Sequence, residues 1–409
     1  MNENNYIHLS ITPYRQRTAS LSQNMYFNDE HKLFRETVRQ FIAKEVVPNA
    51  NTWEAERHIP KEILKKMGDM GYLGLLFPEE YGGSKADFWF SVVFLEEIAR
   101  SYMGGFSTMI SVHTYMAINH IYKAGSEELK QKYLVPAIAG EKLAALGITE
   151  PDAGSDVAAI RTTARKEGDE FVINGSKTFI SNGFYGDFIT LTCKTEAAAG
   201  VAGISLIVVD LDAEGVTKTK LNKMGWHSSD TAEIKFDEVR VPISNLIGYE
   251  NGGFYYLMES LQIERLVASV MAVAGAELAL EETLRYLHER EAFGRKIAKF
   301  QAIRHKIAEI ATEIEISKHF VYNTCQMFSE GKMVVKECSM AKLYTAELAK
   351  RVTDTCLQFF GGYGFIEDYP ICRMYRDVRV GTIAGGTSEI MKEIIAKIVI
   401  DEVKYAKVY

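Results

Sequence analysis

The chain has 409 residues, 47% of them hydrophobic, and a formal net charge of −7. This length allows about two or three domains with a large core, and the mild acidity argues against nucleic acid as a main partner. No run of roughly 18 apolar residues occurs, which excludes a membrane-spanning helix by hydropathy. The five cysteines are scattered and odd in number, so we expect reduced thiols, and no Cys/His cluster has metal-ligand spacing.

The first part of the chain divides into a polar start and a helical region. Residues 1–26 are irregular and predict a disordered or loosely packed extension, with a transit peptide as the alternative. Over 27–142 apolar residues recur at helical spacing, so we predict an N-terminal α-helical domain in which Pro48 ends the first helix. Further helices are predicted over 60–71, 88–102, 106–123 and 129–139.

The apolar period changes near residue 143 and changes back near residue 251. Residues 143–250 predict a middle β domain, a small barrel or a sandwich, with strands over 204–209 and 232–239. Asn174 and Gly175 favour a tight hairpin turn between two strands. Residues 251–409 predict a C-terminal bundle of antiparallel helices. Its long helical runs cover 253–290, 297–329, 333–360 and 387–403.

Three polar, glycine-rich stretches carry the functional signal. Residues 147–159 read GITEPDAGSDVAA after a β-like run, which predicts a turn whose exposed backbone can bind a polar ring edge or a phosphate. A plain surface turn is the alternative for this stretch alone. Residues 358–377 read QFFGGYGFIEDYPICRMYRD, and residues 381–389 read GTIAGGTSE.

These stretches together resemble the acyl-CoA dehydrogenase family. The first fits Gly-hydrophobic-Thr-Glu-x-x-x-Gly-Ser-Asp at every fixed position. The second fits Gln-x-x-Gly-Gly-x-Gly-aromatic, followed by Asp368, Arg373 and Asp377 at the family's spacing. The resemblance runs from near Phe27 to near Ile400. It implies an α+β fold with an N-terminal helical domain, a middle small β-barrel domain and a C-terminal four-helix bundle.

The resemblance implies FAD-dependent α,β-dehydrogenation of an acyl-CoA thioester. A base takes the α-proton, and the β-hydrogen leaves as a hydride to flavin N5. Phe179 stands where many members have Trp, and ordinary core packing is the alternative for it and for Phe293. The family's FAD positions correspond to Ile148, Thr149, Gly154, Ser155, Phe179, Ser181, Thr387 and Glu389, and, reaching over from a neighbouring subunit, to Arg290, Phe293, Gln301, Gln358, Gly361 and Gly362.

The base is where this sequence departs from many family members. They carry Glu in a Tyr-Glu-Gly-Thr pattern, whereas this chain has Gly385, whose N–H can donate to the thioester oxygen but which has no carboxylate. Glu264 is a lone acid in the apolar run SLQIERLVA and resembles the base of the isovaleryl- and long-chain-type branches. We predict that Glu264 is the base and that burial raises its pKa. An ion pair with an arginine on a solvated face is the alternative.

The acyl group is predicted less sharply than the reaction. Ser155, Arg265 and Ala384 are predicted to contact the substrate. The sequences at 252–266 and 384–395 look more like the long-chain branch, which predicts medium-to-long fatty acyl-CoA in β-oxidation. Ala384 replaces a common Tyr and widens the pocket, so a branched short-chain, isovaleryl-type acyl group stays open. An acyl carrier protein in place of CoA is a further alternative.

The resemblance also implies partners. We expect a homotetramer that completes each FAD site across subunits, and an electron-transferring flavoprotein that takes the electrons. The expected location is the cytoplasm, or the mitochondrial matrix for a eukaryotic source. A flavin monooxygenase-like relative and a catalytically inactive binding relative, such as the DNA-associated proteins of this fold, stay open as alternatives. The acidic balance of the chain argues against the DNA-associated kind.

Overall fold

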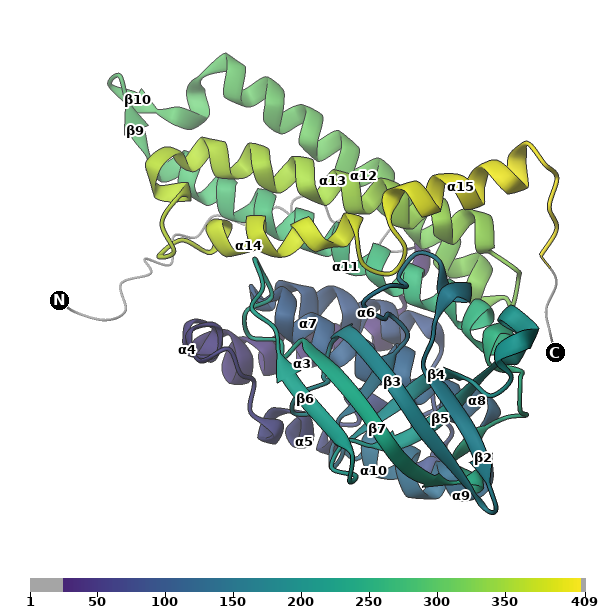
Figure 1. Cartoon of the computed structure of the whole chain (residues 1–409). Helices are drawn as coiled ribbons and strands as arrows, with labels where there is room; N and C mark the ends of the chain where they lie inside the picture. The colour runs from purple at the N-terminus through teal and green to yellow at the C-terminus, as the bar shows by residue number, and fades with distance from the viewer. Residues whose placement is uncertain (1–24, 406–409) are drawn as a thin grey trace.

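The computed structural model describes residues 25–405, so the predicted N-terminal extension lies outside the described residues except for its last two. Figure 1 shows three parts in chain order: helices in purple and blue, a β sheet in teal, and a helical bundle in green and yellow. The bundle lies across one side of the other two parts. The order of helices, sheet and helices confirms the predicted α+β fold.

The N-terminal part is built from short helices, three of which start at a side-chain cap, at Asn28, Asp87 and Ser126. The Asn28 side chain accepts from the His31 N–H at 2.9 Å to start α3, and Asp87 accepts from the Trp89 N–H at 2.9 Å to start α6. The helices are α3 (Asp29–Phe41), α4 (Ala50–Glu56), α5 (Lys61–Asp69), α6 (Phe88–Ile98), α7 (Gly104–Ser111), α8 (Ile118–Ala124), α9 (Glu127–Leu129) and α10 (Val135–Ile138).

The prediction that Pro48 ends the first helix is wrong. A π-helical turn, Ile42–Val46, and a 3₁₀ turn, Val47–Asn49, carry the chain from α3 into α4. Pro48 lies in the first turn of the 3₁₀ segment. At the start of a helical segment the N–H that proline lacks would have no helical partner in any case, so the chain turns without breaking.

The middle part is one mixed β sheet. Its pairing order runs from β6 at one edge through β7, β3, β2, β4 and β5 to β8, and β1 pairs with β4 in parallel. The predicted strands near 204–209 and 232–239 are β5 and β7. The strands are β1 (Ala144–Gly147), β2 (Thr163–Glu167), β3 (Glu170–Ile180), β4 (Phe188–Lys194), β5 (Ile204–Asp210), β6 (Val216–Lys220), β7 (Ala232–Pro242) and β8 (Leu246–Ile247).

The predicted hairpin turn at Asn174 and Gly175 is wrong, because both residues lie inside β3. The chain reverses instead between β2 and β3, next to Gly168, which has φ +61°. The Asn174 side chain accepts from the Glu238 N–H of β7 at 3.0 Å. A Cβ on Gly175 would lie 2.5 Å from Thr162 Oγ1, so glycine is needed there for close packing within the sheet.

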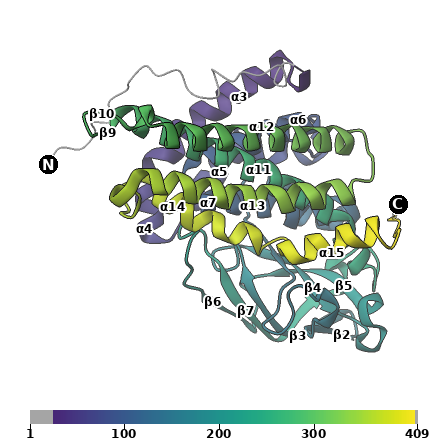
Figure 2. The same cartoon turned by 90° about the horizontal axis from the view of Figure 1, so that it is seen from above.

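The predicted C-terminal runs form the bundle. Figure 2 shows α11, α12, α13 and α15 side by side above the sheet, and α13 packs against all the others. The helix α14 is one that the periodicity does not predict. The elements are α11 (Gly253–Glu289), the hairpin strands β9 (Glu291–Ala292) and β10 (Arg295–Lys296), α12 (Gln301–Ser329), α13 (Val335–Phe360), α14 (Pro370–Val378) and α15 (Ser388–Val399).

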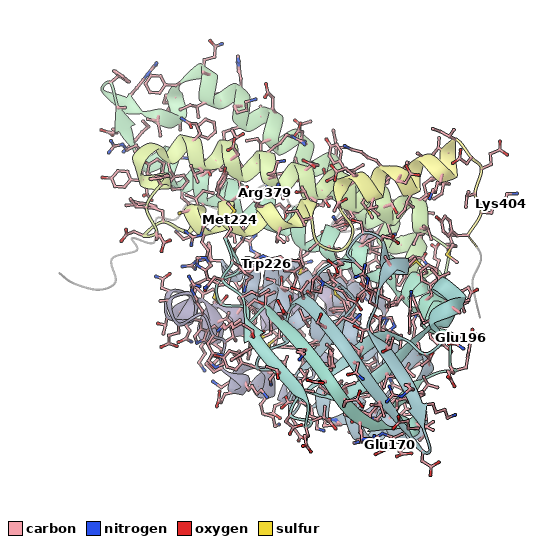
Figure 3. All side chains as sticks on the ribbon, viewed as in Figure 1. Glu170, Glu196, Met224, Trp226, Arg379 and Lys404 are labelled. Carbon is pink, nitrogen blue, oxygen red and sulfur yellow. The ribbon has the colours of Figure 1, made fainter. Side chains whose placement is uncertain are left out.

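Asp377 on α14 joins the three parts of the molecule. Its buried carboxylate accepts from the Trp226 N–H at 2.6 Å, beyond β6, and from the Gly104 N–H at 2.9 Å, at the start of α7. Figure 3 labels Trp226 at this seam, between the sheet and the bundle. Arg373, one turn earlier, donates to Asn51 at 2.6 Å. These two motif residues therefore hold the parts in register.

Within residues 25–405, no helix is long and apolar enough to cross a membrane.

Candidate active site

A buried ion pair holds the loop at 147–159 in place. Glu150 accepts from the Lys177 ammonium at 2.8 Å and from the N–H groups of Arg161 and Thr162 at 2.6 and 3.0 Å. Burial works to raise the pKa of Glu150, but the Lys177 charge and these hydrogen bonds outweigh it, so the pKa is lowered. Glu150 is thus held as a carboxylate, and the loop is fixed from the inside.

The outer edge of this loop is open. Ile148 and Thr149 are half-buried, whereas Gly154 and Ser155 are exposed. A Cβ on Gly154 would approach only the Thr149 methyl group, at 3.8 Å. A ligand can therefore come close to the loop backbone and reach the short hydroxyls beside it.

Phe179 departs from regular strand geometry next to this loop. Its φ of +60° is rarely adopted by a bulky residue, and the pairing of β3 with β7 shifts register between Lys177 and Ile180. The side chain is 69% exposed, so the core-packing alternative is wrong. Because the Thr178 N–H donates to the Thr149 carbonyl at 2.9 Å, Phe179 lies beside the open loop edge. Strain of this kind is typical of functional sites.

Ser181 follows at the end of β3 and is half-buried. The next residue, Asn182, is buried and donates to the carbonyls of Met109 at 2.9 Å and Ala144 at 3.0 Å. This side chain anchors the end of β3 to β1 and to the N-terminal helices. Ser181 is therefore held at a fixed place, close to Phe179.

Glu264 is buried on α11, with 6% of its surface exposed. Its Oε1 atom has no hydrogen-bond partner among the described residues, and His120 Nε2 lies 3.9 Å away. Burial raises the pKa of Glu264 to about 7, against a hydrogen bond from Ser260 and the charge of Arg265. The alternative of an ion pair on a solvated face is therefore wrong.

Arg265 forms no ion pair within 4 Å of this carboxyl group and contacts α13 instead. Its guanidinium donates to the Ser339 hydroxyl of α13 at 3.5 Å and is buried. Lys342, one turn further along α13, donates to the carbonyl of Gly386. Burial, followed by repulsion from the Arg265 charge, lowers the pKa of Lys342 to about 8.

The turn before α15 presents backbone rather than side chains. Ala384 and Gly385 are exposed, and Gly385 has φ +66° with nothing within 4 Å of a Cβ built on it. Thr387 caps α15 by accepting from the Ile390 N–H at 3.2 Å, and its hydroxyl also interacts with the Glu389 carboxylate, whose pKa is lowered. Glu389 is exposed in the first turn of the helix.

A hollow of about 520 Å³ lies at the far end of the bundle, where α11 ends and α13 meets its glycines. Arg290 lies at its wall, with its guanidinium carbon 5.8 Å from the centre of the Tyr363 ring. Gly361 has φ +58° and ψ −135°, a conformation that glycine alone adopts readily. The hollow is lined by Tyr286, Arg290, Ile297, Gln358, Phe359, Phe360, Gly361, Gly362, Tyr363 and Ile366.

Phe293 and Gln301 lie close to this hollow but do not line it. Phe293 occupies the β9–β10 turn with φ +51° and is 95% exposed, so core packing is wrong for it as well. Gln301 is exposed at the start of α12. Both Figure 1 and Figure 2 place the β9–β10 hairpin at the end of the bundle that projects away from the sheet.

Comparisons with known proteins agree with this architecture. Family models match the chain in three consecutive segments: "Acyl-CoA dehydrogenase, N-terminal domain" over 28–141, "middle domain" over 145–239 and "C-terminal domain" over 251–400. The chain belongs to the acyl-CoA dehydrogenase family. It is an acyl-CoA dehydrogenase, a flavin-dependent oxidoreductase that uses FAD.

Individual relatives cover nearly the whole chain. The long-chain specific mitochondrial acyl-CoA dehydrogenase of Sus scrofa is 38% identical over 96% of this chain and 91% of its own length. A crystal structure of an acyl-CoA dehydrogenase from Geobacillus kaustophilus is 44% identical, with a TM-score of 0.88 over 92% of this chain and 99% of its own. A glutaryl-CoA dehydrogenase from Mycobacterium smegmatis, solved with FADH2, is 26% identical, with a TM-score of 0.87 over 94% and 97%.

The residues of this dehydrogenase that suit FAD lie in three separate groups within one chain. The strained, exposed Phe179 and the approachable loop suit a planar ring and its phosphates, and the hollow beside Arg290 suits an anionic nucleotide. The structure brings Ile148, Thr149, Gly154, Ser155, Phe179 and Ser181 together at the sheet, Ala384, Gly385, Thr387 and Glu389 on one turn, and Arg290, Gln358, Gly361 and Gly362 at the hollow.

Two features of this site give no signal in the sequence. The Glu150 and Lys177 pair fixes the loop, but an acid and a base 27 residues apart give no spacing signal. His120 faces Glu264, but a single histidine in the helix Ile118–Ala124 reads as an ordinary core residue. Only the packing of α8 against α11 brings His120 close to Glu264.

Proposed function

We propose that Glu264 takes the α-proton of an acyl-CoA thioester. The observation that carries this proposal is a buried carboxyl group whose Oε1 has no hydrogen-bond partner among residues 25–405 and whose pKa burial raises to about 7. A base whose pKa lies near the working pH combines availability with proton affinity. Support for Glu264 thus comes from its surroundings as well as from the sequence pattern.

The groups around the base have complementary roles in the proposal. Negative charge develops on the thioester oxygen as the α-proton leaves, and the N–H of Gly385 donates to it. When bound, FAD accepts the β-hydrogen with its electron pair. Phe179 covers the flavin ring and keeps water away, while the hydroxyls of Thr149, Ser155 and Ser181 hold its polar edge and phosphates.

We infer that neighbouring subunits complete the FAD site and that the enzyme is a homotetramer. Phe293 is 95% exposed, and Arg290, Gln358 and Gly361 face an open hollow, which are features expected of a surface that another chain covers. Arg290 then binds the neighbour's nucleotide phosphates, and Phe293 and Gln301 pack beside them. Assembly and FAD retention are coupled in this proposal.

For the substrate we propose medium-to-long straight-chain fatty acyl-CoA. Relatives of similar identity differ in what they act on. A protein from Clostridium sporogenes named 3-(aryl)acrylate reductase is 40% identical over 91% of this chain and 99% of its own, against 38% for the long-chain specific enzyme. The exposed Ala384 leaves room for branched acyl groups, which keeps an isovaleryl-type substrate as the second candidate.

For the electron acceptor we propose an electron-transferring flavoprotein. A relative from Acetobacterium woodii is named as a subunit of a caffeyl-CoA reductase–Etf complex and is 39% identical over 91% of this chain and 98% of its own. A partner of that kind takes electrons from reduced FAD without oxygen.

The test is the flavin absorbance of the FAD-loaded enzyme after anaerobic mixing with acyl-CoA esters from butyryl to palmitoyl, and with isovaleryl-CoA. We expect bleaching that is fastest for medium-to-long chains. If isovaleryl-CoA bleaches the flavin fastest, the proposed substrate is the branched acyl-CoA and not the straight-chain one. If no thioester bleaches the flavin, the chain is an inactive relative of the family.

A further inference from the structure

His120 lies opposite Glu264 and is buried on α8, with 2% of its surface exposed. Its Nε2 atom is 3.9 Å from Glu264 Oε1, and within residues 25–405 neither atom has a hydrogen-bond partner. Buried polar atoms are seldom left unpaired, because each one costs free energy. Two of them that face each other across a short gap indicate a contact that forms during function.

The distance and the charge state both permit a hydrogen bond. A gap of 3.9 Å is about 1 Å longer than a normal N–H···O bond, so a small rotation of the Glu264 side chain closes it. Burial, helped by the charge of Lys123, lowers the pKa of His120 to about 4, so the imidazole is neutral at pH 7. A neutral imidazole has one N–H to donate, and a buried carboxylate is stabilised by such a donor.

Most of the other charged or titratable groups near α11 have partners of their own, although the buried Arg265 Nε atom has none among residues 25–405. His113, in the segment 112–117, contacts the Ala137 carbonyl and accepts from the Ala144 N–H, both at 3.1 Å. Arg265 reaches Ser339, and Lys123 pairs with Glu259 at 3.3 Å. The elements packed against α11 hold the pairs Arg35 with Glu96 and Glu97, Arg39 with Glu97, Arg100 with Glu281, Lys318 with Glu277, Lys342 with the Gly386 carbonyl, and Arg373 with Asn51. His120 is therefore the group positioned to serve the open oxygen of Glu264.

We propose that His120 is a positioning residue for Glu264: its Nε2–H donates to the ionised carboxyl group and holds it in the basic, substrate-facing form. This inference rests on the proposed role of Glu264 as the base. The donor has two effects. It lowers the proton affinity of the carboxylate, and it fixes which oxygen is left to meet the substrate.

The test compares His120→Leu, which has no donor, with His120→Gln, whose amide nitrogen falls close to the position of Nε2. Both variants are prepared with FAD bound, and the rate constant of anaerobic flavin reduction by a saturating acyl-CoA is measured from pH 5 to 9. Removal of a donor raises the pKa of the carboxyl group. We therefore expect the acid limb of the His120→Leu profile to move up by about one pH unit and that of His120→Gln to stay near the native position.

Glu264→Gln is measured in parallel, so that failure of this inference and failure of the proposed function can be told apart. If Glu264→Gln is slow but His120→Leu keeps the native acid limb, or moves it to lower pH, the role of His120 is overturned and the base stands. If Glu264→Gln reduces its flavin at the native rate, both proposals are overturned. Should His120→Leu not fold, a His120→Gln profile shifted upward by a full unit overturns the inference.

Discussion

Glu150 and Glu264 are both buried glutamates, 5% and 6% exposed, yet they differ in their partners and in the direction of their pKa shifts. Glu150 has the Lys177 ammonium and two backbone N–H groups as partners, and its pKa is lowered. Glu264 has an oxygen without a partner, and burial raises its pKa to about 7. An ammonium and two N–H donors outweigh burial at Glu150, whereas at Glu264 burial prevails.

The difference between the two glutamates suits them to different tasks, Glu150 to structure and Glu264 to chemistry. A satisfied carboxylate such as Glu150 does not change its protonation near neutral pH, so it serves to fix the loop that we propose faces the flavin. An unsatisfied carboxyl group such as Glu264 can take and release a proton in that range.

The largest effect is expected from Glu264→Gln. The amide keeps the shape of the side chain but cannot take the α-proton, so FAD and acyl-CoA should still bind while flavin reduction slows by about 10²–10⁴-fold or more. Stopped-flow absorbance under anaerobic conditions measures this rate. Glu259→Gln, on the same helix but paired with Lys123 near the surface, is the matched control and should keep the native rate.

A double variant tests whether a carboxylate at position 385 can replace Glu264 as the base. Gly385 has open space around a built Cβ, so a Glu side chain can be placed there despite the φ of +66°. Glu264→Gln combined with Gly385→Glu should recover part of the lost rate, because the resemblance to the family implies that the base can stand at either position. A double variant as slow as Glu264→Gln alone would mean that the two positions do not serve the same substrate carbon.

Lys177→Met should act mainly on the free energy of unfolding, and less directly on the rate of flavin reduction. It leaves Glu150 as a buried charge without its cation, which typically costs about 3–5 kcal/mol of unfolding free energy. Urea unfolding of the FAD-free protein measures this loss. Lys177→Met with Glu150→Gln removes both charges and should be more stable than the single variant. If Lys177→Met unfolds like the native protein, the pair does not hold the loop.

Arg290→Ala should weaken FAD retention by about 10–100-fold, because a charge-assisted hydrogen bond to a phosphate is lost. Unfolding of the FAD-free protein should be nearly unchanged, since Arg290 is exposed. Equilibrium dialysis against FAD measures the affinity, and Lys296→Ala on the same hairpin is the control. Tight, stoichiometric FAD in a monomeric form would contradict a site completed by a second subunit.

The smallest effect is expected at Phe179. Phe179→Ala should expose the reduced flavin and speed its reaction with oxygen several-fold, whereas Phe179→Trp keeps a planar cover and should leave that rate close to native. Oxygen consumption during turnover measures the difference. An unchanged flavin spectrum together with an unchanged oxidase rate in Phe179→Ala would place the ring away from the flavin.

Much of the fold is predictable from the sequence, because the long helical runs of the bundle and the alternation in β7 are strong periodic signals. Pro48 and the pair Asn174 and Gly175 mislead for one reason. Each is a helix-breaking or turn-forming signal in the sequence, but in the fold it has another place. Pro48 lies at the start of a 3₁₀ segment, and Gly175 lies in β3 where the strand packs closely against Thr162. Local propensity cannot foresee such contacts.

The candidate site is predictable to the extent that motifs carry it. Glu264, Phe179 and the loop residues are identified by sequence pattern, and the structure adds that Glu264 is buried and Phe179 exposed. The features that explain why Glu264 could work as a base, its unpartnered oxygen and the nearby His120, depend on how α8 packs against α11. No spacing within one helix encodes a contact between two.

The central claim is that Glu264 is a buried acid that titrates near neutral pH and takes the substrate proton. The most direct test is the pH dependence of flavin reduction by a saturating acyl-CoA, compared between the native enzyme and Glu264→Gln. Because the base must be ionised, we expect a native rate that falls about tenfold per pH unit once the pH drops below the burial-raised pKa of Glu264, and a slow variant without that limb. A native profile that is flat down to pH 5, or the same acid limb in Glu264→Gln, would contradict it.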